Sequence, residues 1–173
     1  ALDHQRASGE VLSAISGSIA DTTPVFERIL ESCERLFAGK MAVIDLLGDD
    51  GLVRLGAYHG PGRDRIERAY PHAADETSAT GTAIARRQVV HFTGTDGTEP
   101  IPANARVMFD AMGIKAAIGA PMMWEGNGIG AIFVARDHAG PFSEKEIALL
   151  KTFADQAVIA IQNARLVNET REA

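Results

Sequence analysis

The sequence contains a single cysteine, few aromatic residues, no long apolar run and no excess of positive charge. A lone cysteine, Cys33, excludes a disulfide within the chain. No apolar run approaches the ~20 residues that cross a bilayer, and the N-terminus lacks the apolar core of a signal peptide. We therefore expect a cytoplasmic location without membrane insertion.

The charge balance and the motif content exclude further classes. Acidic side chains number 23 against 17 basic ones, a net charge of −6. Nucleic-acid binding needs a basic surface that replaces phosphate counterions, so no nucleic-acid partner is expected. The sequence has no Gly-x-Ser-x-Gly elbow, Walker loop or His-Glu-x-x-His motif, and its histidines lack metal-ligand spacing. No catalytic residue and no metal site are predicted.

The 173 residues, 46% of them apolar, suffice for one domain with its own core. We expect a helical linker over residues 1–20, the domain over 21–169 and the start of a second linker at 170–173. The chain begins without methionine and stops within a helical pattern, which suggests a piece of a longer protein.

Hydrophobic spacing predicts the order of the elements. Helices are expected over residues 2–19 and 24–37, the second capped by Thr23 with Pro24 in its first position. Two hairpins follow, one joining 41–47 to 52–59 and one joining 116–124 to 129–136 around Asn127-Gly128. The segment between them predicts short helices over 64–70, 80–87 and 105–112 and a strand over 89–93. Ser143 and Glu146 form a capping box that opens a helix to about residue 169.

These elements predict an α/β (α+β) fold with a central antiparallel sheet of about five or six strands. The terminal helices must cover one face of the sheet. The irregular middle segment must cover the other face and enclose a pocket, which makes a three-layer α/β/α sandwich.

Several segments together resemble GAF domains. Ile114–Pro121 with Gly128–Val134 looks like the last hairpin of that family, and Phe142–Leu150 with Ala157–Leu166 resembles its exit helix. Thr80–Val90 is similar to its helix-to-strand step, and the likeness covers about residues 22–168. It implies a GAF-like sandwich and a regulatory, non-catalytic domain that senses a small molecule.

Residues 5–19 resemble the linker before GAF domains in bacterial sensor histidine kinases and nucleotide cyclases. The likeness implies a histidine kinase or cyclase effector domain in the same full-length chain. GAF domains bind cyclic nucleotides, bilins, haem or nothing known, so the cofactor is left unknown. The alternative to a sensor is a ligand-free dimerisation or spacer module.

Eight residues are candidates for ligand binding, namely Asp45, Thr80, Gly81, His91, Phe92, Met108, Phe109 and Met112. Asp45 interrupts an apolar strand, so it is either a polar anchor in the pocket or the solvated end of an edge strand. The start of the helix at Thr80-Gly81 could receive an anion. The aromatic and methionine side chains are either core or the apolar lining of the pocket.

Other chemical interpretations are weaker. Cys33 lies on an apolar helix face and is assigned to the core, because GAF-type methionine sulfoxide reductases need several cysteines and bilin-binding domains carry theirs in the middle segment. His72 or His91 could ligate haem iron. Of the Asn-Lys-Phe-Asp-Glu signature of cyclic-nucleotide GAF domains, only Phe142 and Glu146 remain. Gly126–Ala131 matches a dinucleotide-binding pattern but leads into a strand, so it is interpreted as a turn. Five arginines could frame an anion or form a solvated face: Arg63, Arg65, Arg68, Arg86 and Arg87.

The C-terminal helix carries an unbroken heptad stripe, which is typical of helix pairing. We expect a homodimer through the terminal helices, with ligand binding biasing the pairing and so the effector. The stripe consists of Leu150, Ala154, Ala157, Ile161 and Ala164.

Overall fold

The computed structural model describes residues 18–93 and 100–172. Within these residues six strands form one antiparallel sheet in the order β3-β2-β1-β6-β5-β4. The elements are α2 (Ser18–Phe37), β1 (Met41–Leu47), β2 (Leu52–His59), α3 (Arg63–Arg68), β3 (His72–Ala73), α4 (Ala79–Arg86), β4 (Val90–Phe92), α5 (Ala103–Met112), β5 (Ala116–Trp124), β6 (Asn127–Arg136) and α6 (Glu144–Glu172).

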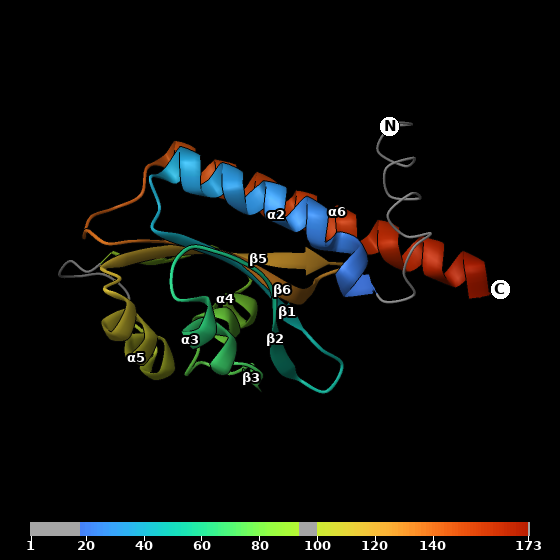
Figure 1. Cartoon of the computed structure of the whole chain (residues 1–173), viewed down its shortest axis with the longest axis horizontal. Helices are drawn as coiled ribbons and strands as arrows, with labels where there is room; N and C mark the ends of the chain where they lie inside the picture. The colour runs from blue at the N-terminus through green and yellow to red at the C-terminus, as the bar shows by residue number, and fades with distance from the viewer. Residues whose placement is uncertain (1–17, 94–99, 173) are drawn as a thin grey trace.

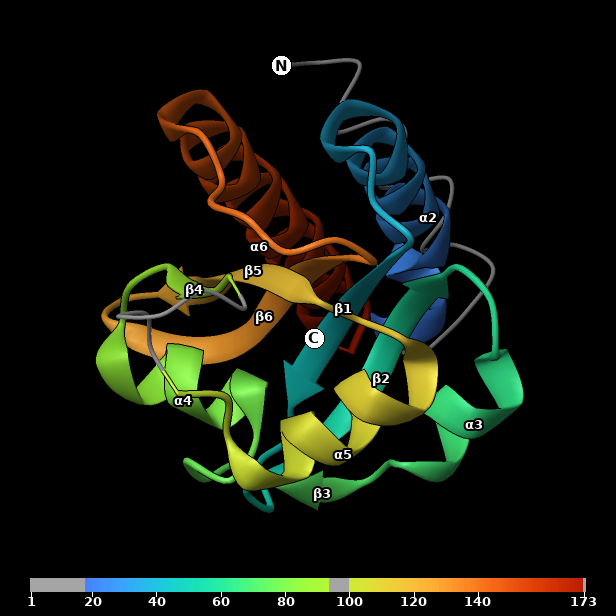
Figure 2. The same cartoon turned by 90° about the vertical axis from the view of Figure 1, so that its left-hand side faces the viewer.

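The layers are those that the sequence predicts. Helices α2 and α6 lie side by side on one face of the sheet, and α3, α4 and α5, here called the lid, lie on the other (Figures 1 and 2). The α/β/α sandwich is therefore confirmed. The sixth strand is the two-residue β3 at the sheet edge, which is too short to produce a pattern in the sequence.

Side chains along each strand alternate between two separate apolar cores. The helix-side cluster joins α2 and α6 to the sheet and includes Phe26, Leu30, Ile44, Ile118 and Leu150. The lid-side cluster joins the opposite sheet face to the lid and includes Val43, Ile66, Phe92, Phe109 and Phe133. The sheet is thus buried on both faces, as its apolar strands predict.

Helix α2 runs without interruption through Pro24, so the predicted start of a new helix at Thr23-Pro24 is wrong. Proline fits helical φ and is exposed here, so its ring meets solvent rather than the core. On this helix Leu36 is half exposed, whereas Phe26, Leu30 and Phe37 are buried. The helix expected over 2–19 falls, up to residue 17, outside the described residues.

The β5–β6 turn lies two residues before the predicted Asn127-Gly128. Trp124 pairs with Asn127, and the two residues between them, Glu125 and Gly126, have φ values of 51° and 81°. Positive φ at both central positions defines a type I′ hairpin turn. Gly128 serves packing instead, because a Cβ there would lie 2.6 Å from Ile84 of α4.

The capping box of α6 is confirmed. The Ser143 amide donates to Glu146 Oε1 at 2.8 Å, and the Glu146 amide donates to Ser143 Oγ at 3.1 Å. These two bonds satisfy backbone donors that the first turn leaves without helical partners.

The heptad stripe of α6 packs within the chain, which corrects its assignment to a partner helix. All five side chains are at most 7% exposed, and all of them except Ala164 belong to the helix-side cluster. Because α6 lies against both α2 and the sheet, its apolar stripe is used by its own domain. The stripe consists of Leu150, Ala154, Ala157, Ile161 and Ala164.

Candidate ligand-binding site

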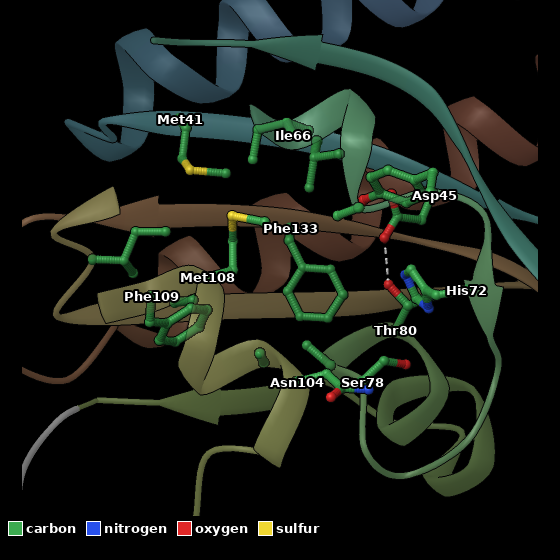
Figure 3. A pocket seen from close by; sticks show the side chains of 17 residues that line it. Met41, Asp45, Ile66, His72, Ser78, Thr80, Asn104, Met108, Phe109 and Phe133 are labelled. Atoms are coloured by element: carbon green, nitrogen blue, oxygen red, sulfur yellow. Dashed lines mark hydrogen bonds between the residues drawn. The ribbon is translucent and has the colours of Figure 1, made fainter. Parts of the chain in front are cut away.

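A cavity of about 230 Å³ lies between the lid and the sheet. At about 30 Å³ per water in the liquid, this volume equals that of about eight waters. Figure 3 shows polar side chains, among them Asp45, His72 and Thr80, gathered at one end, and Met41, Met108 and Phe109 toward the other. The site is thus a mostly apolar space with one polar end, the usual composition of a small-molecule pocket.

Asp45 lies on the sheet side of the cavity, at its polar end. It is 4% exposed and lies on β1, the third strand of six, so the edge-strand interpretation is wrong. Tyr70 Oη donates to Asp45 Oδ1 at 2.6 Å, and Thr80 Oγ1 donates to Oδ2 at 2.5 Å. The carboxyl therefore joins the strand to the lid through one hydroxyl on each oxygen.

Burial raises the pKa of the Asp45 carboxyl above its ordinary value of 3.8, because the charged form loses hydration. The hydrogen bonds from Thr80 and Tyr70 and the positive charge of a protonated His72 oppose that rise. Burial, together with the neighbouring Asp45 charge, also raises the pKa of the Tyr70 hydroxyl, which keeps it a donor.

The first turn of α4 positions the Thr80 hydroxyl next to the Asp45 carboxyl. Ser78 caps the helix, and its Oγ accepts from the Gly81 amide at 2.9 Å. A Cβ on Gly81 would lie 1.9 Å from the Asp75 carbonyl oxygen, so only glycine allows the chain to approach this closely. Gly81 thus acts by packing, and its amide is already bonded to Ser78.

The apolar end combines sheet and lid. The Phe133 ring on β6 lies across Gly119 of β5, where a Cβ would approach the ring to 2.0 Å. Met108 and Phe109 of α5 line the cavity from the lid. Phe92 supports Phe109 through an edge-on contact with ring centroids 6.3 Å apart.

The structure brings four of the eight predicted residues to the cavity wall: Asp45, Thr80, Met108 and Phe109. Phe92 and Gly81 lie behind the wall. A Cβ on Gly62, at the start of α3, would lie 2.9 Å from Met112 Cε, so Met112 packs there instead. His91 is paired with Ile118, a member of the helix-side cluster, and so lies on the face of the sheet opposite to the cavity.

Sequence reasoning missed most of the polar end. Tyr70 and Ser78 were not considered, His72 was considered only for haem, and Asn104 on α5 was not considered. Tyr70 follows a short helix and His72 lies on the edge strand β3, and neither position has a periodic pattern. The only available signal was Asp45, since a buried carboxylate requires hydrogen-bond donors from elsewhere in the fold.

The remaining candidates do not contribute to the cavity wall. Cys33 is buried in the helix-side cluster, and burial raises the pKa of its thiol to about 12. The five arginines are exposed, and Arg63 lies over the Tyr58 ring, 5.9 Å from its centroid. In residues 18–93 and 100–172, no three His, Cys, Asp or Glu side chains are grouped to hold a metal ion. Over the same residues, no helix has the length and apolar character needed to span a membrane.

The GAF domain family model matches residues 21–161, which is most of the chain and contains both walls of the cavity. The chain belongs to the GAF domain family. Among the curated proteins, none matches this GAF domain.

Several solved structures share the fold. One is a domain of a protein described as a two-component sensor histidine kinase from Sinorhizobium meliloti 1021. It has a TM-score of 0.70 and 23% identity, over 87% of this chain and 96% of that chain. Free methionine-R-sulfoxide reductase from Neisseria meningitidis, bound to its substrate, has a TM-score of 0.67 and 15% identity, over 92% and 87%. The blue-light-absorbing PixJ GAF domain from Thermosynechococcus elongatus has a TM-score of 0.68 and 13% identity, over 90% and 93%.

At these identities the likeness shows the fold alone. GAF domains occur in signalling proteins together with effector domains, including sensor kinases and chemotaxis proteins. They are generally regulatory, although some proteins with this fold are enzymes.

Proposed function

We propose that this GAF domain is the small-molecule-sensing regulatory domain of a cytoplasmic signal-transduction protein. Its ligand binds in the lid-side cavity and controls a histidine kinase or cyclase effector domain of the same full-length chain through α2 and α6. The observation that carries the proposal is the cavity itself, an apolar space of about 230 Å³ that ends at a buried carboxylate. A domain that served only as a spacer would have no use for a buried charge at an unfilled space, since such a charge costs stability.

Binding rather than catalysis is proposed for this site. The cysteine lies in the helix-side cluster, on the far side of the sheet from the cavity, and its raised thiol pKa of about 12 keeps it protonated at neutral pH. At the polar end, Asp45 is bonded to two hydroxyl groups, an arrangement that positions a binding group.

A thermal-shift screen of small metabolites tests sensing. A ligand at a hundred times its Kd stabilises the folded state by about 2.7 kcal/mol, which raises Tm by roughly 5–11 °C for a domain of this size. Replacing Ala117, a cavity-lining residue that is 2% exposed, by leucine should fill the space and abolish the shift. Ala85→Leu on the exposed face of α4 is the matched control and should keep it. If a ligand raises the Tm of Ala117→Leu as much as it raises that of the wild-type chain, the ligand binds outside this cavity. If no compound raises the Tm of the wild-type chain, the spacer module is favoured.

We also propose that the domain forms a homodimer through the outward faces of its terminal helices. Ile159 and Leu166 lie seven residues, or about two turns, apart on α6, and their side chains are 49% and 60% exposed, so they form an apolar strip on the outer side of this helix. Ile159→Glu should weaken the dimer, measured as a lower mass by light scattering. Trp124→Glu, at the exposed β5–β6 turn, should leave the mass unchanged. A wild-type monomer at high concentration would refute the pairing.

A further inference from the structure

The carboxylate of Asp45 lies in the cavity wall without a fixed cation beside it. Of the described residues that line the cavity, none is an arginine or a lysine. The neighbouring strands place Leu55 and Ala131 beside Asp45, α4 contributes the Thr80 hydroxyl, and the α3–β3 connection contributes the Tyr70 hydroxyl. The base whose charge acts on Asp45 is His72 on β3. A buried carboxylate is ordinarily paired with a cation, so one partner of this site is missing from the protein itself.

The two hydroxyls leave room for that partner. An ionised carboxylate has about four lone-pair positions, and Tyr70 and Thr80 occupy two of them. Because Asp45 lines the cavity, the remaining positions are open to a donor that enters it.

An anionic ligand is disfavoured at the same end. It would meet the Asp45 carboxylate, and the Gly81 amide, which could otherwise receive an anion at the start of α4, donates to Ser78 Oγ. The opposite end of the cavity is formed by apolar side chains such as Met108, Phe109 and Phe133 (Figure 3). The geometry therefore fits an amphipathic molecule whose polar end donates hydrogen bonds and carries positive charge.

We propose that the ligand of this domain is a small amine, whose protonated nitrogen binds the Asp45 carboxylate and whose apolar part contacts Met108, Phe109 and Phe133. The inference rests on the proposed sensing function and names the chemical class of its ligand. A cavity with the volume of about eight waters holds a small ligand body better than it holds a whole nucleotide. Charge-assisted hydrogen bonds are roughly twice as strong as neutral ones, so the ammonium supplies much of the affinity.

The affinity for the amine should decrease as the pH is lowered. The amine needs the ionised Asp45, and burial raises the pKa of that carboxyl, so affinity falls as pH decreases through this raised pKa, at a higher pH than for an exposed aspartate. The Tyr70 hydroxyl stays protonated throughout, because its pKa is raised as well.

The test uses two sets of compounds matched in size and differing in head-group charge. The first is 2-phenylethylamine, 2-phenylethanol and phenylacetate, and the second is hexylamine, hexanol and hexanoate. Affinities are measured by calorimetry for the wild-type chain, Asp45→Asn and the exposed control Asp110→Asn. In each set the amine should bind about 10- to 100-fold more tightly than the alcohol, and the acid should bind most weakly. Asp45→Asn should remove that preference and leave alcohol binding unchanged, whereas Asp110→Asn should retain it.

The outcomes separate this inference from the proposed function. Alcohols or acids that bind as tightly as the amines, or an amine preference that survives in Asp45→Asn, would overturn the amine assignment. If only neutral or anionic metabolites stabilise the domain, the domain is a sensor for another ligand class and the amine assignment is wrong. If none of the six compounds binds, the amine assignment fails, and the sensing function fails as well only if the thermal-shift screen also finds no ligand. If Asp45→Asn does not fold, the amine assignment is tested by comparing the affinities of the amines, alcohols and acids for the wild-type chain.

Discussion

Replacing Ala157 by glutamate is expected to unfold this domain. The Ala157 side chain is 0% exposed and lies in the helix-side cluster, where α6 packs on α2 and the sheet. A carboxylate there would be buried among apolar side chains and would also need more space than a methyl group occupies. Burial of an unpaired charge in a packed core costs about 4 kcal/mol or more, a large part of the 5–15 kcal/mol that stabilises a typical domain. Loss of the cooperative transition in circular dichroism would be the result.

The neighbouring Gln156→Glu is the matched control, since it adds the same charge on the exposed side of the same helix. It should change the free energy of unfolding by less than about 0.5 kcal/mol. If Ala157→Glu instead folds with wild-type stability, α6 is not packed on the sheet as described, and its heptad stripe is available to a partner after all.

Replacing Asp45 by asparagine is expected to stabilise the ligand-free domain at neutral pH. The unfolded chain ionises this carboxyl near its ordinary pKa of 3.8, whereas in the folded domain burial raises the pKa. Between these two values the folded state holds a proton that the unfolded state has lost, so stability decreases as pH rises through this window. Each unit of pKa difference corresponds to about 1.4 kcal/mol, or roughly 3–6 °C in Tm. The gain in Tm should therefore be greatest at pH 7 and should vanish toward pH 4, as measured by thermal unfolding across that range.

Asp110→Asn removes a carboxylate from the exposed face of α5 and should change the free energy of unfolding by less than about 0.5 kcal/mol at any pH. A lower Tm of Asp45→Asn at pH 7 would mean that the bonds from Tyr70 and Thr80 outweigh the cost of burial. A domain that keeps a destabilising carboxylate in an unfilled cavity does so for binding, which is why this measurement and the amine series should agree.

The sequence predicts most of the fold because its strongest signals are local. The capping box at Ser143, the apolar run of β1 and the apolar face around Cys33 each depend on a few neighbouring residues. Patterns of this kind identify which face of an element is buried, and two hairpins with flanking helices leave few ways to assemble a sandwich.

The partners of Asp45 could not be predicted, because they come from separate parts of the chain. Tyr70 and Thr80 reach the carboxyl across 25 and 35 residues, from a connection without periodic pattern and from the first turn of α4. The heptad stripe of α6 shows a related limit. Its spacing correctly indicated a buried helix face, but spacing does not tell whether the covering surface belongs to the same chain or to another copy.

In the described residues, the helix-side and lid-side clusters lie on opposite faces of the sheet, which separates them. Substitutions in one cluster can therefore accumulate during evolution with little effect on the other. Substitutions at lid-side positions such as Met108 and Phe109 share no packing partners with the α2–α6 pair, so their effects on stability should be nearly additive with changes there. A lineage can therefore exchange one pocket chemistry for another while the paired helices keep their geometry.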